Sequence, residues 1–405
     1  MTEGLLNCLN YNDGMSVQEA AVRALAGQEA PAVTEALVQC LYDDGPVGNA
    51  AAQALTNREP TAVTEILCRV IADGDWTMLM SGVDRLEGLT AWHSSAVTEA
   101  LLAHLTDDDK FVREAAVRAL ASREIPAVTQ AIVRRLHDYR SNVRTASAEA
   151  LADREDPAVT EALLERLDDS TGSVREAAVR ALANRKAFGV TQALLTKLSD
   201  RDDRARTATV KALANRKAFG VTEALLERLD DYNPRVVSGA VRALVGHEAD
   251  GVTTALLQFL NYGYEEARPF AVQALAARHV PGVTTALLNC LNDINPSVRV
   301  MAVRALASRD DPGVIEALLE CVKDNSRDVR EAAKLAITNR RSPRALVILA
   351  DELSKLDKSS LNQLVSAAQK LMNRHYPQVG TSDQSRVLAA MEWLTRCMML
   401  ANSPS

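Results

Sequence analysis

The chain has 405 residues and a formal net charge of −7; 47% of its residues are hydrophobic, but only 4% are aromatic. The negative charge disfavours a general electrostatic affinity for nucleic acid or for anionic membranes. No apolar run approaches the ~18 residues of a membrane-spanning helix, and residues 1–30 lack a basic-then-apolar leader pattern, so neither a membrane span nor a signal peptide is predicted.

A repeating pattern begins at the first residues. The block Ala-Val-Thr-Glu-Ala-Leu-Leu recurs in drifted form, with its valine at Val33, Val63, Val97, Val128, Val159, Val190, Val221, Val252, Val283 and Val314. Residues 1–6 align with the inside of this block. We therefore expect the chain to be the C-terminal part of a longer protein. The alternative is a natural array whose first helix is exposed or dimerises.

Each unit contains two apolar stripes at helical spacing. Val159, Leu163 and Leu167 predict a first helix, and the block Val-Arg-Glu-Ala-Ala-Val-Arg-Ala-Leu, present at 112–120 and 174–182, predicts a second one. Proline often opens the first helix, as at Pro157. Gly or Asn often follows the second helix, as at Gly27, which predicts left-handed C-terminal caps.

The unit at 61–95 departs from this pattern. Met78 and Leu79 replace the Val-Arg pair, three residues are added, and two of the three tryptophans lie here. A break in a strict period exposes a different surface. We therefore predict a localised partner contact at Trp76, Leu79, Trp92 and His93. Drift near a chain end is the alternative.

From Val97 to residue 340 the period is 31 residues, with an Asp in the turn and Val-Arg opening the second helix. This pattern resembles the HEAT family, particularly the short HEAT-like repeats of phycobilisome lyases. The resemblance implies an all-α fold: a right-handed α-solenoid of about eleven helix pairs at 1–340. The period is lost after Arg340, so residues 341–405 are predicted to form a non-repeat helical cap.

The resemblance also implies a structural ladder in which Asp and Arg bond between neighbouring repeats. Its expected members are Asp107, Arg113, Asp138, Arg144, Asp169, Arg175, Asp200 and Arg206. A phosphate track is the alternative, but the ladder is favoured because the Asp keeps the same period as the Arg.

Two other columns are candidates for partner binding. Cations follow the second helices at Arg123, Arg154, Arg185 and Arg216, where they either complement helix C-termini or face an anionic partner. Tyrosines lie in or beside the turns within repeats at Tyr139, Tyr232, Tyr262 and Tyr264. Tyrosine often anchors protein interfaces, although each ring could instead only cover the neighbouring turn.

No catalytic, cofactor or metal motif is found. Phosphate loops, HExxH and CxxC pairs are missing from the sequence, and the histidines are scattered. Cysteines without CxxC pairing indicate a reducing, cytoplasmic location. Cys8, Cys40, Cys290 and Cys321 share one repeat position and are expected to be partly exposed.

We therefore expect a non-catalytic protein-recognition scaffold or sensor, as the arm of a larger NTPase-type signalling or defence protein. Its partner would be another protein or another domain of the parent chain. One alternative is a bilin lyase or pigment-handling subunit, suggested by the repeat type alone. The other is a nucleic-acid-binding protein that uses the Arg column, which the acidic balance disfavours.

Overall fold

The computed structural model describes residues 2–9, 14–41, 43, 45–72, 85–280 and 282–338. Every regular element in these ranges is helical, as expected for an all-α solenoid. The chain divides into two compact units, Met1–Ala212 and Leu213–Ser405. The predicted cap at 341–405 lies outside the described residues.

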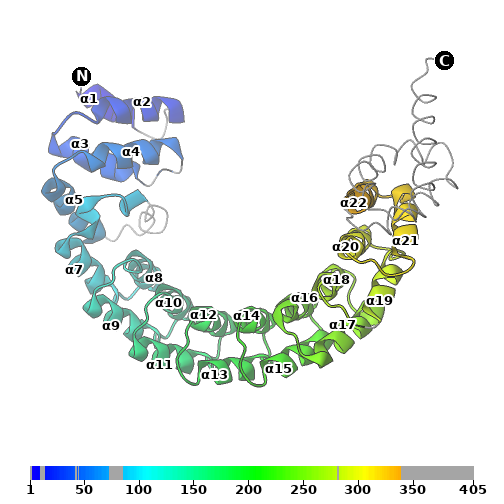
Figure 1. Cartoon of the computed structure of the whole chain (residues 1–405). Coiled ribbons are helices and arrows are strands. Elements are labelled where there is room, and N and C mark those ends of the chain that lie inside the picture. Colours follow the sequence, from blue (N-terminus) through cyan, green and yellow to red (C-terminus); the bar gives the residue numbers. More distant parts are fainter. Residues whose placement is uncertain are drawn as a thin grey trace, which may run out of the picture. The chain divides into compact units, whose positions relative to one another are not determined.

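The first unit is a succession of short helices (Figure 1). They are α1 (Thr2–Asn7), α2 (Met15–Leu25), α3 (Pro31–Cys40), α4 (Pro46–Thr56), α5 (Pro60–Ala72), the 3-10 helix η1 (Thr90–His93), α7 (Ser95–His104), α8 (Lys110–Ala119), α9 (Pro126–Arg135), α10 (Ser141–Ala150), α11 (Pro157–Arg166), α12 (Gly172–Leu182), α13 (Val190–Lys197) and α14 (Asp203–Leu213).

The second unit continues the same alternation of first and second helices. Its elements are α15 (Val221–Glu227), η2 (Arg228–Asp230), α16 (Pro234–Ala243), η3 (Leu244–Gly246), α17 (Asp250–Tyr262), α18 (Arg268–Ala276), α19 (Val283–Cys290), α20 (Pro296–Leu306), α21 (Val314–Glu320), η4 (Cys321–Lys323) and α22 (Arg327–Thr338).

The core follows from the two apolar stripes. In α11, Val159 and Leu163 are buried, and in α12 so are Val174, Ala178 and Leu182. Within each unit the second helices of adjacent repeats pack closely, as α8, α10 and α12 do in the first unit and α18, α20 and α22 in the second (Figure 1). The alanines on their buried stripe permit this close approach, because interaxial distance depends on side-chain size at the contact.

The predicted left-handed caps after the second helices are wrong. Backbone φ is negative at Gly27 and Gly246; positive φ in the described residues occurs only at Gly45, Gly189, Gly220, Gly282 and Gly313. Four of these glycines directly precede a first helix. The carbonyls at and just beyond the ends of several second helices accept hydrogen bonds from arginine side chains.

Candidate functional site

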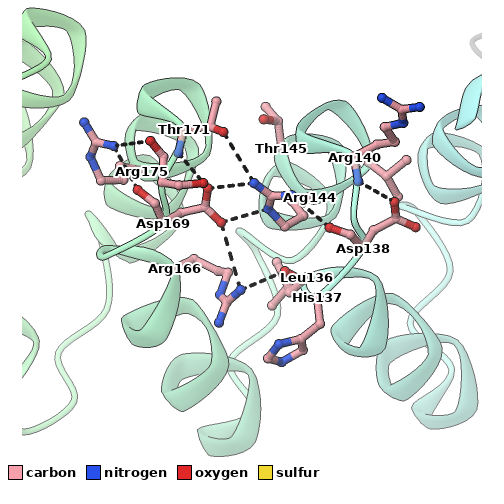
Figure 2. A network of polar contacts seen from close by, with 12 residues as sticks. Leu136, His137, Asp138, Arg140, Arg144, Thr145, Arg166, Asp169, Thr171 and Arg175 are labelled. Carbon is pink, nitrogen blue, oxygen red and sulfur yellow. Dashed lines mark hydrogen bonds and ion pairs between the residues drawn. The ribbon is translucent and has the colours of Figure 1, made fainter.

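An Asp–Arg ladder joins neighbouring repeats along the turns within repeats (Figure 2). Arg144 in α10 donates from Nε and Nη2 to the two carboxylate oxygens of Asp169, each at 2.8 Å. Its Nη1 donates to the backbone oxygen of Asp138, in the preceding turn, at 2.8 Å. Asp169 Oδ1 also accepts from the backbone N–H of Thr171 at 2.9 Å. One guanidinium therefore ties two successive turns together.

The same bond recurs with the arginine 25 residues before its aspartate. The further pairs are Arg113–Asp138 and Arg175–Asp200 in the first unit, and Arg268–Asp293 and Arg299–Asp324 in the second. Arg206 repeats the contact to the preceding turn, donating to the backbone oxygen of Asp200 at 2.8 Å. Asp107 accepts from the backbone N–H of Asp109 at 2.8 Å and so shapes the first turn of this series.

The ladder is buried and its charges are matched. The side chains of Arg113 and Asp138 are only 3% and 2% exposed. Burial opposes ionisation of Asp138, but hydrogen bonds from Arg113 and from the backbone of Arg140 hold the pKa of its carboxyl below the ordinary value. The hydrogen bond to Asp138 in turn raises the pKa of Arg113. Both partners are therefore ionised in the folded protein.

A second ladder joins threonine to arginine between repeats. Arg185 Nη1 donates to Thr160 Oγ1 at 2.8 Å, and its Nη2 donates to the backbone oxygen of Leu151 at the end of α10, also at 2.8 Å. The threonine is that of the recurrent Val-Thr-Glu block. The other pairs of this kind are Thr34–Arg58, Thr98–Arg123, Thr129–Arg154, Thr253–Arg278 and Thr284–Arg309, with Thr222–His247 in the same register.

These arginines are the cation column, for which the sequence left two interpretations, complementing helix ends or facing an anionic partner. Arg123 and Arg185 are buried, and Arg154 and Arg216 are half-buried. Desolvation by burial lowers the pKa of all four side chains. Arg154 Nη2 donates to the backbone oxygens of Leu120 and Ala121 at the end of α8. The geometry favours the helix-end interpretation.

At the irregular repeat of residues 61–95, one of the four predicted contact residues, Trp92, is corrected. Trp92 in η1 is fully buried, its backbone oxygen accepts from Arg123 Nη2 at 2.5 Å, and the Arg123 guanidinium lies 5.0 Å from the centre of its ring. His93 is about half exposed, and its Nε2 lies 2.9 Å from the backbone oxygen of Glu87. Trp76 and Leu79 lie outside the described residues. Trp92 is thus part of the core, and His93 alone of the described pair reaches the surface.

Tyr139 lies in a turn within a repeat of the first unit, and two arginines contact its ring. Its side chain is exposed, and its hydroxyl donates to the backbone oxygen of Asp108 at 3.4 Å. The guanidinium carbons of Arg113 and Arg140 lie 4.6 and 5.2 Å from the centre of its ring. This favours, for Tyr139, the interpretation that the ring covers its neighbouring turns.

One rung of the Asp–Arg ladder is replaced in the second unit. The position held by Arg268 in α18 and Arg299 in α20 is Val237 in α16, and the matching aspartate position, 25 residues later, is Tyr262. Val237 is fully buried, so an arginine there would need its partner. Because both partners are changed, no buried charge is left uncompensated. The Val-Val pair at 236–237 was the sequence signal for this change, and sequence reasoning missed it.

The turn that follows is built differently from its neighbours. Helix α17 continues through Tyr262. Elsewhere the ladder aspartate at this position accepts a hydrogen bond from the backbone N–H two residues later, and Tyr262 has no carboxylate to do so. Arg268 Nη1 reaches the backbone oxygen of Gly263 at 3.4 Å instead of the oxygen at the ladder position. A Cβ on Gly263 would lie 2.5 Å from the ring of Phe259, so this position fits only glycine without movement of the ring.

A hollow of about 500 Å³ opens at this altered turn, between α15–η2 and α17. We call it the tyrosine hollow, after its lining by Tyr232, Tyr262, Tyr264, Phe259, Gln258 and Asp230. The hydroxyl of Tyr264 donates to the backbone oxygen of Tyr232 at 3.4 Å and so connects two successive turns. Tyr262 is 93% exposed. Three of the four tyrosines chosen from the sequence therefore surround one hollow.

The remaining chemistry of the described residues is sparse. No cluster of three or more His, Cys, Asp or Glu side chains there could hold a metal ion. Burial, with the nearby turn aspartate, raises the pKa of the Cys40, Cys290 and Cys321 thiols to about 11. The expectation of partial exposure is wrong for these three, whereas Cys8 is half-exposed. None of the described helices combines the length and the apolar character needed to cross a membrane.

Four segments of the chain match the family description HEAT repeats, at residues 98–183, 191–276, 253–338 and 284–368. These matches together cover more than half of the chain. The chain belongs to the HEAT-repeat family. Residues 17–43 in addition match the description PBS lyase HEAT-like repeat. No curated protein is significantly similar to this HEAT protein.

Among solved structures, the HEAT protein is similar to importin-β. Importin-β crystallised in ammonium sulfate has a TM-score of 0.59 at 13% identity, over 99% of this chain and 67% of that one. Kap95 in its complex with Nup1 gives 0.56 at 15% identity, over 99% and 64%. Kap95p studied with RanGDP gives 0.55 at 14%, over 98% and 60%, so this chain spans about three fifths of its length. At such identities the likeness shows the fold, an all-α solenoid.

Proposed function

We propose that this HEAT protein is a non-catalytic protein-recognition scaffold that binds its partner at the tyrosine hollow. The observation that carries the proposal is the coincidence of the replaced rung with three tyrosines around one hollow. In the repeats from Arg113 to Arg330, the arginine at the position of Val237 otherwise bonds to the turn of its own repeat, and most of these arginines also pair with the aspartate of the next one. Val237 and Tyr262 cannot form this ion pair, and Tyr262 exposes an aromatic ring at the position of the aspartate.

The composition of the hollow suits recognition of a protein segment. Tyrosine combines a large apolar ring with a polar tip and loses little conformational entropy on binding, so it is enriched in interface hot spots. The volume of the hollow, about 500 Å³, lies within the range of roughly 300–1,000 Å³ that is usual for ligand pockets. The likeness to importin-β, seen in a structure with Nup1, gives the proposal a precedent in the same fold.

The finer expectation concerns what the scaffold belongs to. We propose that it acts as the recognition or sensor arm of a larger assembly, with the partner either a separate protein or another domain of a longer chain. The nucleic-acid alternative depended on the Arg column, whose members bond between repeats. The pigment-handling alternative has the match of residues 17–43 as its only support.

Affinity capture with a variant that keeps the fold tests the proposal. The double substitution Val237→Arg and Tyr262→Asp would rebuild the missing rung while removing one wall of the hollow. We expect the native chain to retain partner proteins that this variant loses. Ile294→Ser, which removes a side chain that is 82% exposed at the next turn, is the matched control and should retain them. Retention of the same proteins by all three chains would contradict the proposal.

A further inference from the structure

The charged residues around the tyrosine hollow indicate which kind of side chain it receives. Its charged lining residues are Asp230 and Asp231, and neither Lys nor Arg lines it. Asp230 is exposed at the end of η2, while Asp231 is buried. The turn that carries Tyr264 continues with the exposed pair Glu265 and Glu266. The charged side chains that line the hollow are thus all anionic.

The arginines near this hollow pair with other carboxylates or lie outside its lining. Arg228 pairs with Glu227 at 3.5 Å, and Arg268 pairs with Asp293 at 2.9 Å. Arg235 stands exposed at the start of α16, beyond the lining of the hollow. Within the described chain, the lining of the hollow therefore places no Lys or Arg beside the Asp230 carboxylate.

In the first unit, a tyrosine in a turn within a repeat contacts two cations. The guanidinium carbons of Arg113 and Arg140 lie 4.6 and 5.2 Å from the centre of the Tyr139 ring. Tyrosine rings attract cations through their quadrupole, and a carboxylate beside the ring adds Coulomb attraction. The tyrosine hollow offers rings and a carboxylate together, with no Lys or Arg in its lining.

We propose that the tyrosine hollow is selective for a cationic side chain, so that the partner segment inserts a Lys or Arg between the tyrosines and pairs it with Asp230. This inference rests on the proposed function and specifies its ligand. An acidic segment would meet Asp230 and the two glutamates and be repelled. A purely apolar segment would leave the Asp230 carboxylate partly desolvated without a partner.

Selection from a random peptide library displayed on phage tests the inference. The native full chain is the bait, and the Val237→Arg, Tyr262→Asp chain is used for counter-selection. We expect the enriched peptides to share a Lys or Arg at one position. Replacing that residue by Gln in a synthetic peptide should weaken binding by about fivefold or more, the effect of a lost cation–π contact.

Asp230→Asn supplies the matched charge variant, because it keeps the shape of the side chain. It should weaken the basic peptide several-fold and reduce the salt dependence of its binding, while leaving the Gln peptide nearly unchanged. Enrichment of peptides without a basic residue would overturn the cation selectivity and leave protein recognition at the hollow intact. If no peptide prefers the native chain over the counter-selected one, the proposed function itself fails.

Discussion

At the scale of single residues, each ladder aspartate holds several groups at once. Asp138 accepts from Arg113 Nε at 2.8 Å and Nη2 at 3.0 Å, and from the backbone N–H of Arg140 at 2.9 Å. Replacing one partner of such a buried pair leaves the other charge uncompensated. Asp138→Ala should therefore lower the free energy of unfolding by about 3–5 kcal/mol in urea titrations.

Asp168→Ala is the matched control for this substitution. Asp168 pairs with Lys197 at 2.6 Å, but its side chain is 82% exposed. Exposed ion pairs contribute roughly 0–1 kcal/mol, so this variant should unfold at nearly the native urea concentration. Equal losses for the two substitutions would show that the buried ladder has no special role in stability.

Cysteine reactivity gives a second prediction at this scale. Burial raises the pKa of the Cys40, Cys290 and Cys321 thiols to about 11, so very little thiolate forms at pH 8 and reagents reach it poorly. Iodoacetamide should modify half-exposed Cys8 well before these three, as read by peptide mass mapping. Modification of all four at one rate in the folded chain would contradict the buried arrangement.

At the scale of elements, the replaced rung between α16 and α17 can be tested by restoring it. Val237→Arg alone would bury an unpaired guanidinium and should destabilise the chain strongly. Tyr262→Asp alone alters an exposed side chain and should cost little. The double variant should recover much of the loss, with a coupling energy of about 1–3 kcal/mol in a double-mutant cycle. Additive single effects would show that position 262 does not face position 237.

The close approach of Gly263 to Phe259 gives another test on α17. A methyl group at Gly263 would meet the Phe259 ring at 2.5 Å, so Gly263→Ala should displace the ring, reshape the hollow and cost about 1–3 kcal/mol. Gly251→Ala, on the same helix, meets only Leu226 at 4.0 Å. That control should be neutral or slightly stabilising, because alanine favours helix. Equal unfolding curves for the two variants would argue against a packed Phe259.

The sequence was sufficient for the helix pairs, because an interior of Ala, Val and Leu at two helical stripes repeats with little change. It was also sufficient for the Asp–Arg ladder, since both residue types keep one period. It did not assign the Thr–Arg ladder, although Thr160 and Arg185 recur with the same spacing of 25 residues. Arg185 could point to solvent or back onto the end of α10, and the choice depends on packing between repeats. The aligned repeat sequences alone do not show this packing.

The candidate site was only half predictable for the same reason. Tyr232, Tyr262 and Tyr264 could be chosen as turn residues, but their gathering around one hollow depends on the altered turn after α17. Trp92 was chosen wrongly, because an irregular unit with tryptophans looked like exposed surface. In the structure that tryptophan fills the core beside Arg123.

At the scale of the whole molecule, the ladders distribute charge-dependent stability along the chain. Hydrogen bonds from ladder arginines and backbone groups outweigh burial and lower the pKa of Asp138, Asp169, Asp200 and Asp324. A carboxyl whose pKa is lower in the folded state stabilises the fold above the ordinary Asp pKa of about 3.9. That stabilisation is lost as the pH falls through the folded values.

The chain should therefore lose helical structure steeply below about pH 4, as followed by circular dichroism. Because repeats are stabilised by their neighbours, the protonation of one rung weakens the interfaces on both sides. Chains carrying Asp138→Asn should start less stable and lose less further stability between pH 7 and pH 3. An identical pH dependence in that variant would remove Asp138 from the acid response.

Site-specific photo-crosslinking of the full chain tests most directly the central claim, that the tyrosine hollow receives a protein partner. A benzophenone amino acid replaces Tyr262 in one chain and the exposed Ile294 of the next turn in the other. In cells that produce the chain, the account predicts a protein adduct at position 262 that is lacking at position 294. Adducts of equal yield at both positions, or none at position 262, would contradict it.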